Sequence, residues 1–399
     1  MSENIFANLQ ETPPDPLFGL VAEYNKDAAE DKVNLIVGAF HNEAGVIPLL
    51  DSVHQAEQKL LSYKANKNYL GILGDNGYID AIQKLVFGED HPFVKDKALV
   101  CAQTPGGTGS LRAAGDLLFK ANPNATVWLS NPTWANHKNI FPGAGLKIAN
   151  YRYYNSQNHT LDFAGMLEDL HQAKSGDMVL LHGCCHNPTG MDLDQSQWEA
   201  VGHLAVEKNL IVLIDFAYQG FAEGIEEDRL GINVLSKMPL DLMVASSGSK
   251  NFSLYNQRIG ALNIFVQDAN LRAKVKGNLS SIIRRNYSNP PAHGAHIVSQ
   301  ILNDHRLHEL WLSELKGMRD RMKAMRKYFD EVFSAEGIEG YEHVIKQNGM
   351  FSLLPLSKEQ VLKLRQEHHI YLVNSGRINV SALNNARIEK LADLIKNKI

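Results

Sequence analysis

The sequence contains little cysteine and no long apolar run. Its three cysteines are Cys101, Cys184 and Cys185, and an odd count with two adjacent members is a poor basis for a disulfide framework. We therefore expect buried free thiols in a reducing compartment. No stretch approaches the roughly 18 apolar residues of a membrane-spanning helix, and residues 1–20 lack a basic region followed by an apolar run. These features predict a cytoplasmic protein that makes no membrane contact.

Charge of one sign is not in excess, and several ligand-binding motifs are missing. The formal net charge of −4 gives no indication of a nucleic acid as partner. His182 and His186 lie close together, but no carboxylate or further Cys/His motif completes a metal site, so we expect no metal. The segment from Gly107 to Arg112 has an arginine where a dinucleotide-binding fingerprint has its third glycine, and it lacks the P-loop ending.

The composition is that of an ordinary globular protein. Over 399 residues, 44% are hydrophobic and 21% are charged, and this length is enough for roughly two to three domains. From about Leu99 to Phe265, apolar runs typical of strands alternate with helical spacing, which predicts a mostly parallel sheet flanked by helices. The C-terminal third, with a long helix over 306–337, predicts a smaller α+β unit. The expected strands cover residues 33–38, 98–102, 126–129, 178–181, 210–214, 242–245, 259–265, 349–354 and 370–373.

One segment combines small hydroxyl residues with a single amine at the end of an expected strand. The apolar run 242–245 is followed by Ser246-Ser247-Gly248-Ser249-Lys250, and Arg258 lies eight residues further on. Open α/β sheets bind ligands at the carboxyl ends of their strands. A desolvated lysine there loses its proton more easily and becomes a nucleophile toward carbonyl groups. The alternative is a loop in which Lys250 is simply exposed.

Three further segments have a functional and a structural interpretation. The strand, glycine turn and helix start around residues 104–110 could hold a phosphate on backbone N–H groups, or form a tight turn without a ligand. Asp215 directly follows an apolar strand and could bind a cationic group, cap a helix or bind magnesium. Arg377 lies in a small and apolar segment, where a cation needs either an internal acid or a bound carboxylate.

Taken together, the motifs resemble those of the aspartate and aromatic aminotransferase family, whose members use pyridoxal phosphate (PLP). Ser247-x-x-Lys250 with Arg258 resembles the segment that carries the cofactor in this family, and the turn Asn187-Pro188-Thr189-Gly190 is a strong match. The matches run in family order from near the N-terminus to near the C-terminus. The resemblance implies the PLP-dependent transferase fold, in which amino acids and 2-oxo acids are the substrates.

The resemblance also implies roles for individual residues. Lys250 would hold the cofactor and move the proton, and Asp215 would keep the pyridine nitrogen protonated so that the ring withdraws electrons. Arg377 would bind the substrate α-carboxylate through a two-pronged contact. The remaining implied contacts are Ser247, Arg258, Gly107 and Thr108 to the phosphate, Trp134 on the ring, Asn187 and Tyr218 to the ring oxygen, and Gly38, Trp134 and Asn187 to the substrate.

A homodimer with shared active sites is a further implication. In the family, an aromatic residue in the position of Tyr69 reaches the other subunit's site, and the residue matching Arg284 meets the distal carboxylate of aspartate or glutamate. From spacing alone, Tyr69 is a packing residue and Arg284 with Arg285 is a solvated surface pair. The implied division is an arm at 1–18, a small domain at 19–45 plus 310–399, and a large PLP-binding domain at 46–309.

Some residues depart from the family pattern and leave the substrate mixed. Gly248 stands where the family usually has an aromatic residue, and Ala39, Phe40 and His41 differ from the commonest aspartate-type segment. Ile47 resembles the aromatic branch. The aspartate branch is matched by Asn68, Thr108 and Asn289.

The expected activity is therefore transfer of an amino group from aspartate to 2-oxoglutarate by a ping-pong mechanism, with tyrosine and phenylalanine as further donors. The first alternative is a tyrosine aminotransferase. The others are a nicotinamide-dependent dehydrogenase, which the missing fingerprint argues against, and a catalytically silent family member that acts as a binding module, which would have little need for Lys250.

Overall fold

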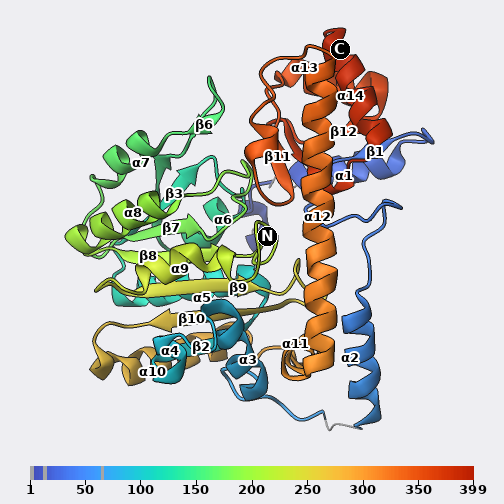
Figure 1. Ribbon diagram of the computed structural model, residues 1–399. Helices are drawn as coiled ribbons and strands as arrows, with labels where there is room; N and C mark the ends of the chain where they lie inside the picture. Colours follow the sequence, from blue (N-terminus) through green and yellow to red (C-terminus); the bar gives the residue numbers. More distant parts are fainter. Residues whose placement is uncertain (1–3, 12–15, 64–66) are drawn as a thin grey trace.

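A seven-stranded sheet forms the centre of the larger part of the molecule (Figure 1). The computed structural model describes residues 4–11, 16–63 and 67–399. Neighbouring strands pair in parallel, except that β10 runs antiparallel to both β2 and β9. The spatial order is β2 (Leu99–Pro105), β10 (Ile259–Phe265), β9 (Leu242–Ser247), β8 (Ile211–Phe216), β7 (Met178–His182), β3 (Thr126–Asn131) and β4 (Lys147–Arg152). The expected mostly parallel sheet is confirmed.

Both faces of the sheet are covered, so its strands are apolar on both sides. In β8, Val212 and Ile214 face one hydrophobic cluster while Leu213 faces the other, as the two-residue period of a strand requires. The second cluster is closed by α5 (Gly106–Ala121), α6 (His137–Gly143) and α10 (Arg272–Asn286). The first cluster is closed by α2 (Asp51–Ser62), α3 (Asn76–Phe87), α4 (Pro92–Lys95), α7 (Phe163–Leu170), α8 (Gln195–Lys208), α9 (Leu230–Leu235) and α11 (Ala292–Asn303).

A smaller α+β part has a hydrophobic core of its own. It contains two two-stranded sheets, β1 with β12 and β11 with β13, packed against helices. The elements are β1 (Val33–Asn34), β11 (Phe351–Leu353), α13 (Lys358–His368), β12 (Ile370–Tyr371), β13 (Arg377–Asn379) and α14 (Asn385–Lys396). The expected strand at 33–38 is thus shorter, because after Asn34 the chain leaves the sheet.

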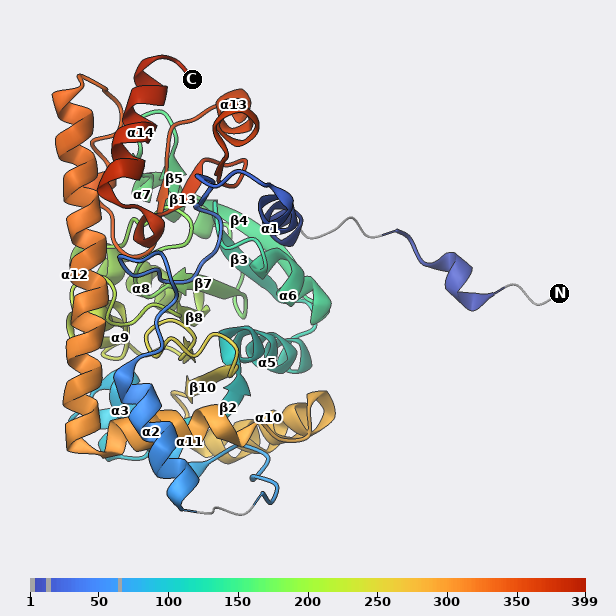
Figure 2. The same cartoon turned by 90° about the vertical axis from the view of Figure 1, so that its right-hand side faces the viewer.

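The long helix α12 (His305–Ala335) connects the two parts (Figures 1 and 2). Its N-terminal half packs into the core of the sheet through residues such as Trp311 and Leu315, and Phe329 and Phe333 pack into the core of the smaller part. The apolar residues follow the period of a helix, which explains why the sequence predicted it almost to its ends.

The N-terminal segment differs from the expected extended arm. Residues 5–8 form a short 3-10 helix, and α1 (Pro16–Lys26) begins inside the predicted arm, with a proline at its first position as helices favour. Residues 1–3 and 12–15 of the arm lie outside the described residues. Figure 2 shows residues 4–11 far from the body of the molecule. Ile5, Phe6 and Leu9 are all more than 70% exposed, so this segment presents apolar side chains to its surroundings.

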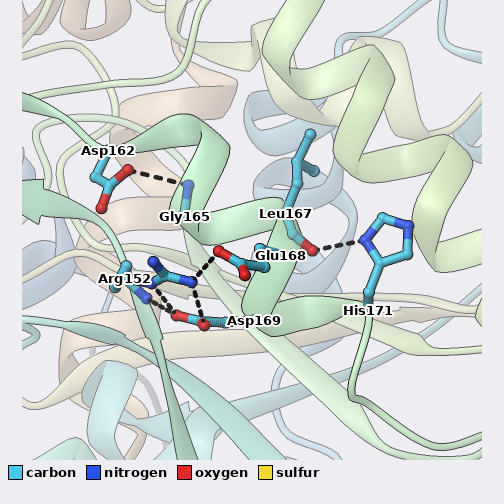
Figure 3. A network of polar contacts seen from close by, with 7 residues as sticks. All are labelled: Arg152, Asp162, Gly165, Leu167, Glu168, Asp169 and His171. Atoms are coloured by element: carbon cyan, nitrogen blue, oxygen red, sulfur yellow. Dashed lines mark hydrogen bonds and ion pairs between the residues drawn. The ribbon is translucent and has the colours of Figure 1, made fainter.

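An ion-pair network pins α7 to the edge strand β4 (Figure 3). Arg152, at the end of β4, binds Asp169 in a two-pronged contact of 2.9 and 2.8 Å and Glu168 at 2.6 Å. These hydrogen bonds lower the pKa of the Asp169 carboxyl. The contacts are solvent-exposed and contribute little stability, but they fix the position of α7 beside the sheet edge.

The cysteines lie as expected. Cys101, Cys184 and Cys185 are free and buried, and burial raises the pKa of each thiol. Among the helices of the described residues, none is long and apolar enough to cross a membrane.

Candidate active site

A cavity of about 360 Å³ opens at the carboxyl ends of the parallel strands. Its walls come from the loops after β7, β8 and β9, the start of α5, and the smaller part of the molecule. Eleven of the residues that the sequence singled out line it: Gly38, Gly107, Thr108, Trp134, Asn187, Asp215, Tyr218, Ser247, Lys250, Arg258 and Arg377. Residues more than 300 positions apart in the chain therefore meet in one place.

One end of the cavity has the chemistry of a phosphate site. Helix α5 starts at Gly106, and its first turn receives no side-chain cap. Gly106 has φ +72°, and a Cβ there would lie 2.4 Å from the guanidinium of Arg258, which therefore sits directly over the helix start. A Cβ at Gly107 would lie 3.2 Å from Ser247, so Ser247 also packs closely against the start of the helix. Open N–H groups at a helix N-terminus together with an arginine bind an oxyanion well.

The opposite wall of the cavity carries a buried carboxylate. Asp215 is the second-to-last residue of β8, and its Oδ2 lies 3.0 Å from Nε2 of His137. Burial acts to raise the pKa of Asp215, but the hydrogen bond with His137 and the positive charge of Lys250 outweigh it, so the pKa lies below its usual range. Asp215 lies within β8 and caps no helix, and no group of three or more His, Cys, Asp or Glu side chains that could hold a metal ion occurs among the described residues.

A chain of imidazoles and hydroxyls continues behind Asp215. His137 Nδ1 lies 2.8 Å from the Thr133 hydroxyl, which lies 3.3 Å from Nε2 of His182. His186 bonds the hydroxyls of Ser130 and Thr189 at 2.9 and 2.8 Å. Burial lowers the pKa of His182 to about 3, with His137 adding to the effect and Asp215 opposing it. The ring of His182 is therefore neutral at physiological pH.

This buried histidine predicts a loss of stability in mild acid. In the unfolded chain His182 takes up a proton near its usual pKa of about 6.5, whereas in the native protein it stays neutral, so stability falls as pH falls below about 6.5. At pH 5 the loss from this group alone should be about 2 kcal/mol. His182→Asn should therefore lose less unfolding free energy than the unmodified protein between pH 7 and pH 5 in urea titrations. The exposed His171→Asn serves as control, and equal pH slopes in all three would contradict the assignment.

Lys250 lies on the cavity wall beside Asp215 and Tyr218. Loss of hydration lowers the pKa of Lys250, the charge of Asp215 opposes the shift, and the charge of Arg258 adds to it. Its Nζ lies 5.0 Å from the centroid of the Tyr218 ring. Burial raises the pKa of the Tyr218 hydroxyl, so that group remains protonated and can donate a hydrogen bond. The exposed-loop alternative for Lys250 is wrong, because the side chain points into the enclosed site.

Arg377 comes from the smaller part and completes the cavity. Its guanidinium donates to the carbonyl of Ile36 at 2.8 Å and to Oδ1 of Asn187 at 3.3 Å, and it lies 4.4 Å from the centroid of the Phe351 ring. Its Nε is buried and has no hydrogen-bond partner in the described part of the chain. Among the described residues, Arg377 makes no ion pair with an internal acid, so its charge faces the cavity without an acidic partner in that part of the chain.

Two predicted site residues do not reach this cavity. Tyr69 is 93% exposed in the loop before α3. Arg284 is exposed in the last turn of α10 and donates to the hydroxyl of Ser288. Both lie on the surface of this single chain, and neither lines the cavity.

Other residues of the site were not predicted from the sequence. His137 binds Asp215, Ser249 accepts from Arg258 at 3.1 Å, and the Tyr255 hydroxyl accepts from the backbone N–H of Phe40 at 2.8 Å. Phe351 lies against Arg377. His137 lies only three residues after Trp134, and this spacing on a helix start was the one available signal.

Comparison with known proteins is consistent with this geometry. A family model described as aminotransferase class I and II matches residues 30–395. The aspartate aminotransferase of Escherichia coli (strain K12) is 45% identical over 392 residues, which cover 98% of this chain and 99% of that protein. The aromatic-amino-acid aminotransferase of Pseudomonas aeruginosa is 42% identical over 391 residues, 98% of each chain. A crystal structure of the aromatic-amino-acid aminotransferase from Burkholderia pseudomallei, covalently bound to pyridoxal phosphate, has a TM-score of 0.96 at 41% identity and covers 99% of both chains.

This chain therefore belongs to the class I and II aminotransferases. It is a transferase that uses pyridoxal phosphate and acts on amino acids and 2-oxo acids, as the resemblance in the sequence implied. The residues present fit that cofactor, because one cavity combines an oxyanion site at α5, an anionic Asp215 for a protonated ring nitrogen and an amine at Lys250.

Proposed function

We propose that this aminotransferase moves the amino group of aspartate to 2-oxoglutarate and accepts tyrosine or phenylalanine as further donors. The observation that supports it is Arg377, a half-buried cation whose partners among the described residues are a carbonyl, an amide and a ring face. A guanidinium in this setting matches a substrate carboxylate in geometry and charge. It lies in the same cavity as Lys250 and Asp215, so the carboxylate and the reacting amine are held within one site.

The proposed roles follow from the surroundings of each residue. Gly107, Thr108, Ser247 and Arg258 hold the cofactor phosphate, and Trp134 packs on its ring. Asp215 stays anionic and pairs with the ring nitrogen, and His137 keeps that carboxylate oriented. Asn187 and the Tyr218 hydroxyl donate to the ring oxygen. Gly38 lines the cavity beside Phe351, and a Cβ there would lie 3.0 Å from the Phe351 ring, so the close approach of this backbone to the ring favours a glycine.

The chain's own contribution to the chemistry is binding, orientation and proton movement. Bound PLP supplies an aldehyde that takes up the amino group and a ring that withdraws electrons from the substrate Cα. Lys250 has a lowered pKa, so its amine can release a proton, act as nucleophile and then carry the Cα proton as a general base. Asp215 and Tyr218 are both buried at the wall of the cavity in which these protons move.

The alternative main activity is that of an aromatic-amino-acid aminotransferase. It is favoured by Ile47, an apolar residue that is 43% exposed in the loop before α2. It is also favoured by the likeness to the Burkholderia pseudomallei protein, which carries that name.

A substrate panel separates the two activities. We expect aspartate to give the highest kcat/KM with 2-oxoglutarate, and tyrosine and phenylalanine to give lower but measurable values. Initial rates at varied aspartate and 2-oxoglutarate should give parallel double-reciprocal lines, because one site stores the amino group between the two substrates. A higher kcat/KM for tyrosine would favour the aromatic activity. Intersecting lines or a requirement for NAD would contradict the aminotransferase mechanism.

We further propose a homodimer with shared active sites in the cytoplasm. The exposed apolar side chains of Ile5, Phe6 and Leu9 need a surface to cover them, and Tyr69 and Arg284 reach outward from this chain. A two-fold interface would bring both outward residues to the partner's cavity. The domain division at 19–45 plus 310–399 and 46–309 is part of the proposal. The separate hydrophobic cores support two domains, but Trp311 and Leu315 pack into the core of the larger part, so the cores favour a boundary on α12 further along the helix than residue 310.

A further inference from the structure

A buried arginine on α12 holds the loop that leads to Phe351. Arg326 is 2% exposed, and its five hydrogen bonds all go to neutral oxygens of residues 344–352. One terminal nitrogen donates to the carbonyl of Val344 at 2.9 Å and to the Ser352 hydroxyl at 2.5 Å. The other donates to the carbonyls of Asn348, Gly349 and Phe351 at 3.3, 2.9 and 2.9 Å.

The charge of Arg326 makes this arrangement unusual. Burial lowers the pKa of Arg326 to about 10, with Cys185 and Asp192 opposing the shift, so the guanidinium is charged at neutral pH. A buried charge is costly unless it is well hydrogen-bonded. Here the two terminal nitrogens bond four carbonyls and one hydroxyl of a stretch in which the chain turns at Gly349, which has φ +75°, while the buried Nε has no hydrogen-bond partner among the described residues. The interaction therefore fixes the shape of a loop and does not neutralise an acid.

The same loop also contacts two residues of the cavity, Arg377 and Tyr218. The ring of Phe351 lies 4.4 Å from the guanidinium of Arg377 and 6.2 Å, edge to face, from the ring of Tyr218. Asn348 donates its backbone N–H to the carbonyl of Gly190 at 2.7 Å, which ties the loop to the turn that carries Asn187. Displacement of the loop would therefore shift the Phe351 ring and the side-chain amide of Asn187, which both contact Arg377, together.

We propose that Arg326 is a positioning residue for substrate binding: through residues 348–351 it places Phe351 against Arg377 and so sets the orientation in which Arg377 receives a carboxylate. The proposal rests on the proposed role of Arg377. Arg326 touches neither the cavity nor the substrate. Its effect should therefore appear in the affinity for carboxylates and not in the proton transfers at Lys250.

The test compares the PLP-loaded variants Arg326→Lys, Phe351→Leu and the double variant with the unmodified enzyme. Lysine keeps the charge but has three donors in place of the fork, so the loop should loosen without losing the buried cation. For Arg326→Lys we expect KM for aspartate and the inhibition constant of succinate to rise about 10-fold, with kcat and the visible absorbance of the bound cofactor within about 3-fold. Arg321→Lys is the matched control on the same helix, since Arg321 donates to the carbonyls of His41, Ser381 and Leu383 instead.

The double variant distinguishes a positioning role from a general structural one. If Arg326 acts through Phe351, the double variant binds succinate no more weakly than Phe351→Leu alone. The proposal would be overturned if the two single losses of succinate affinity multiplied in the double variant, or if Arg321→Lys lost as much affinity as Arg326→Lys. A fall in kcat without a change in KM would also overturn it. Ser352→Ala removes only one of the five bonds and should give a smaller rise of the same kind, which keeps the test open if Arg326→Lys folds poorly. Arg377→Lys tests the underlying role. If it leaves the inhibition constant of succinate unchanged, the function proposed for Arg377 fails. If that constant rises in Arg377→Lys but not in Arg326→Lys and Ser352→Ala, only the inference about Arg326 is overturned.

Discussion

Lys250→Ala is expected to lower kcat for amino transfer by about 10⁴-fold or more, because the nucleophile and the general base are lost together. Lys250 is the one lysine among the residues that line the described cavity, so no neighbouring amine can replace it. The variant should still bind PLP through the contacts at α5 and Arg258. The measurement is single-turnover transfer from aspartate, together with the absorbance of the bound cofactor.

Borohydride labelling checks the same assignment directly. The unmodified enzyme should be yellow, and reduction should bleach it and attach the cofactor irreversibly to Lys250, as peptide mass spectrometry would show. Lys276→Ala, a change on the exposed surface of α10, should behave like the unmodified enzyme. A label on any other lysine, or near-normal activity in Lys250→Ala, would sink the assignment.

Arg284→Ala is expected to lower kcat/KM for aspartate by about 100-fold or more while phenylalanine stays within a few-fold. A loss of this size in kcat/KM is expected when one member of a buried charge pair is truncated, because the distal carboxylate of aspartate is then left without a cation. Phenylalanine has no distal carboxylate, so its kcat/KM does not depend on that pair. In the single chain Arg284 is exposed, and its hydrogen bond within the described part of the chain goes to Ser288. The effect therefore requires that a second copy place Arg284 at the cavity.

The neighbouring arginine provides the matched control. Arg285 has the same charge and lies one residue further along α10, on a different side of the helix. Arg285→Ala should change neither substrate by more than a few-fold. If Arg285 were the sensitive residue, or if both variants behaved alike, the assignment of Arg284 would be wrong.

Mixed dimers test whether the site is shared. Chains with Lys250→Ala and chains with Arg284→Ala should each be nearly inactive with aspartate, but after subunit exchange a mixed dimer contains one site with both residues intact. Part of the activity should then return. Mass spectrometry should first verify that the subunits have exchanged. If no activity returns after that, the result argues against a shared site.

The sequence predicted six of the seven strands of the central sheet, together with cavity residues that follow them, because strand ends carry a local signal; it missed the edge strand β4 (Lys147–Arg152). The run 259–265 was predicted to the residue, although only the structure shows that β10 is antiparallel. Asp215 follows an apolar run directly and Lys250 follows one after four small residues, and the two runs form the neighbouring parallel strands β8 and β9, so their carboxyl ends lie side by side. The partners of Asp215 and Arg377 depend on contacts across the fold, and no spacing in the sequence encodes these.

Gly248 shows where a sequence comparison alone is insufficient. It stands in place of the aromatic residue usual in the family, and the sequence leaves its effect open. In the structure a Cβ at this position would lie 2.9 Å from Cγ2 of Ile259 and 3.4 Å from the ring of Phe252. The space beside the nucleophile is thus filled by the side chains of Ile259 and Phe252, and a larger residue at 248 would have to shift the Ile259 side chain.

The shared helix α12 has a consequence for how the molecule unfolds. Its 31 residues span about 46 Å and supply side chains to both hydrophobic cores. If one core loses its packing, the half of the helix that belongs to that core loses its tertiary contacts. Melting of one core would release half of α12, and a helix half without tertiary contacts is marginal in water. Thermal denaturation of the chain should therefore be strongly cooperative, with the two parts giving one transition instead of two.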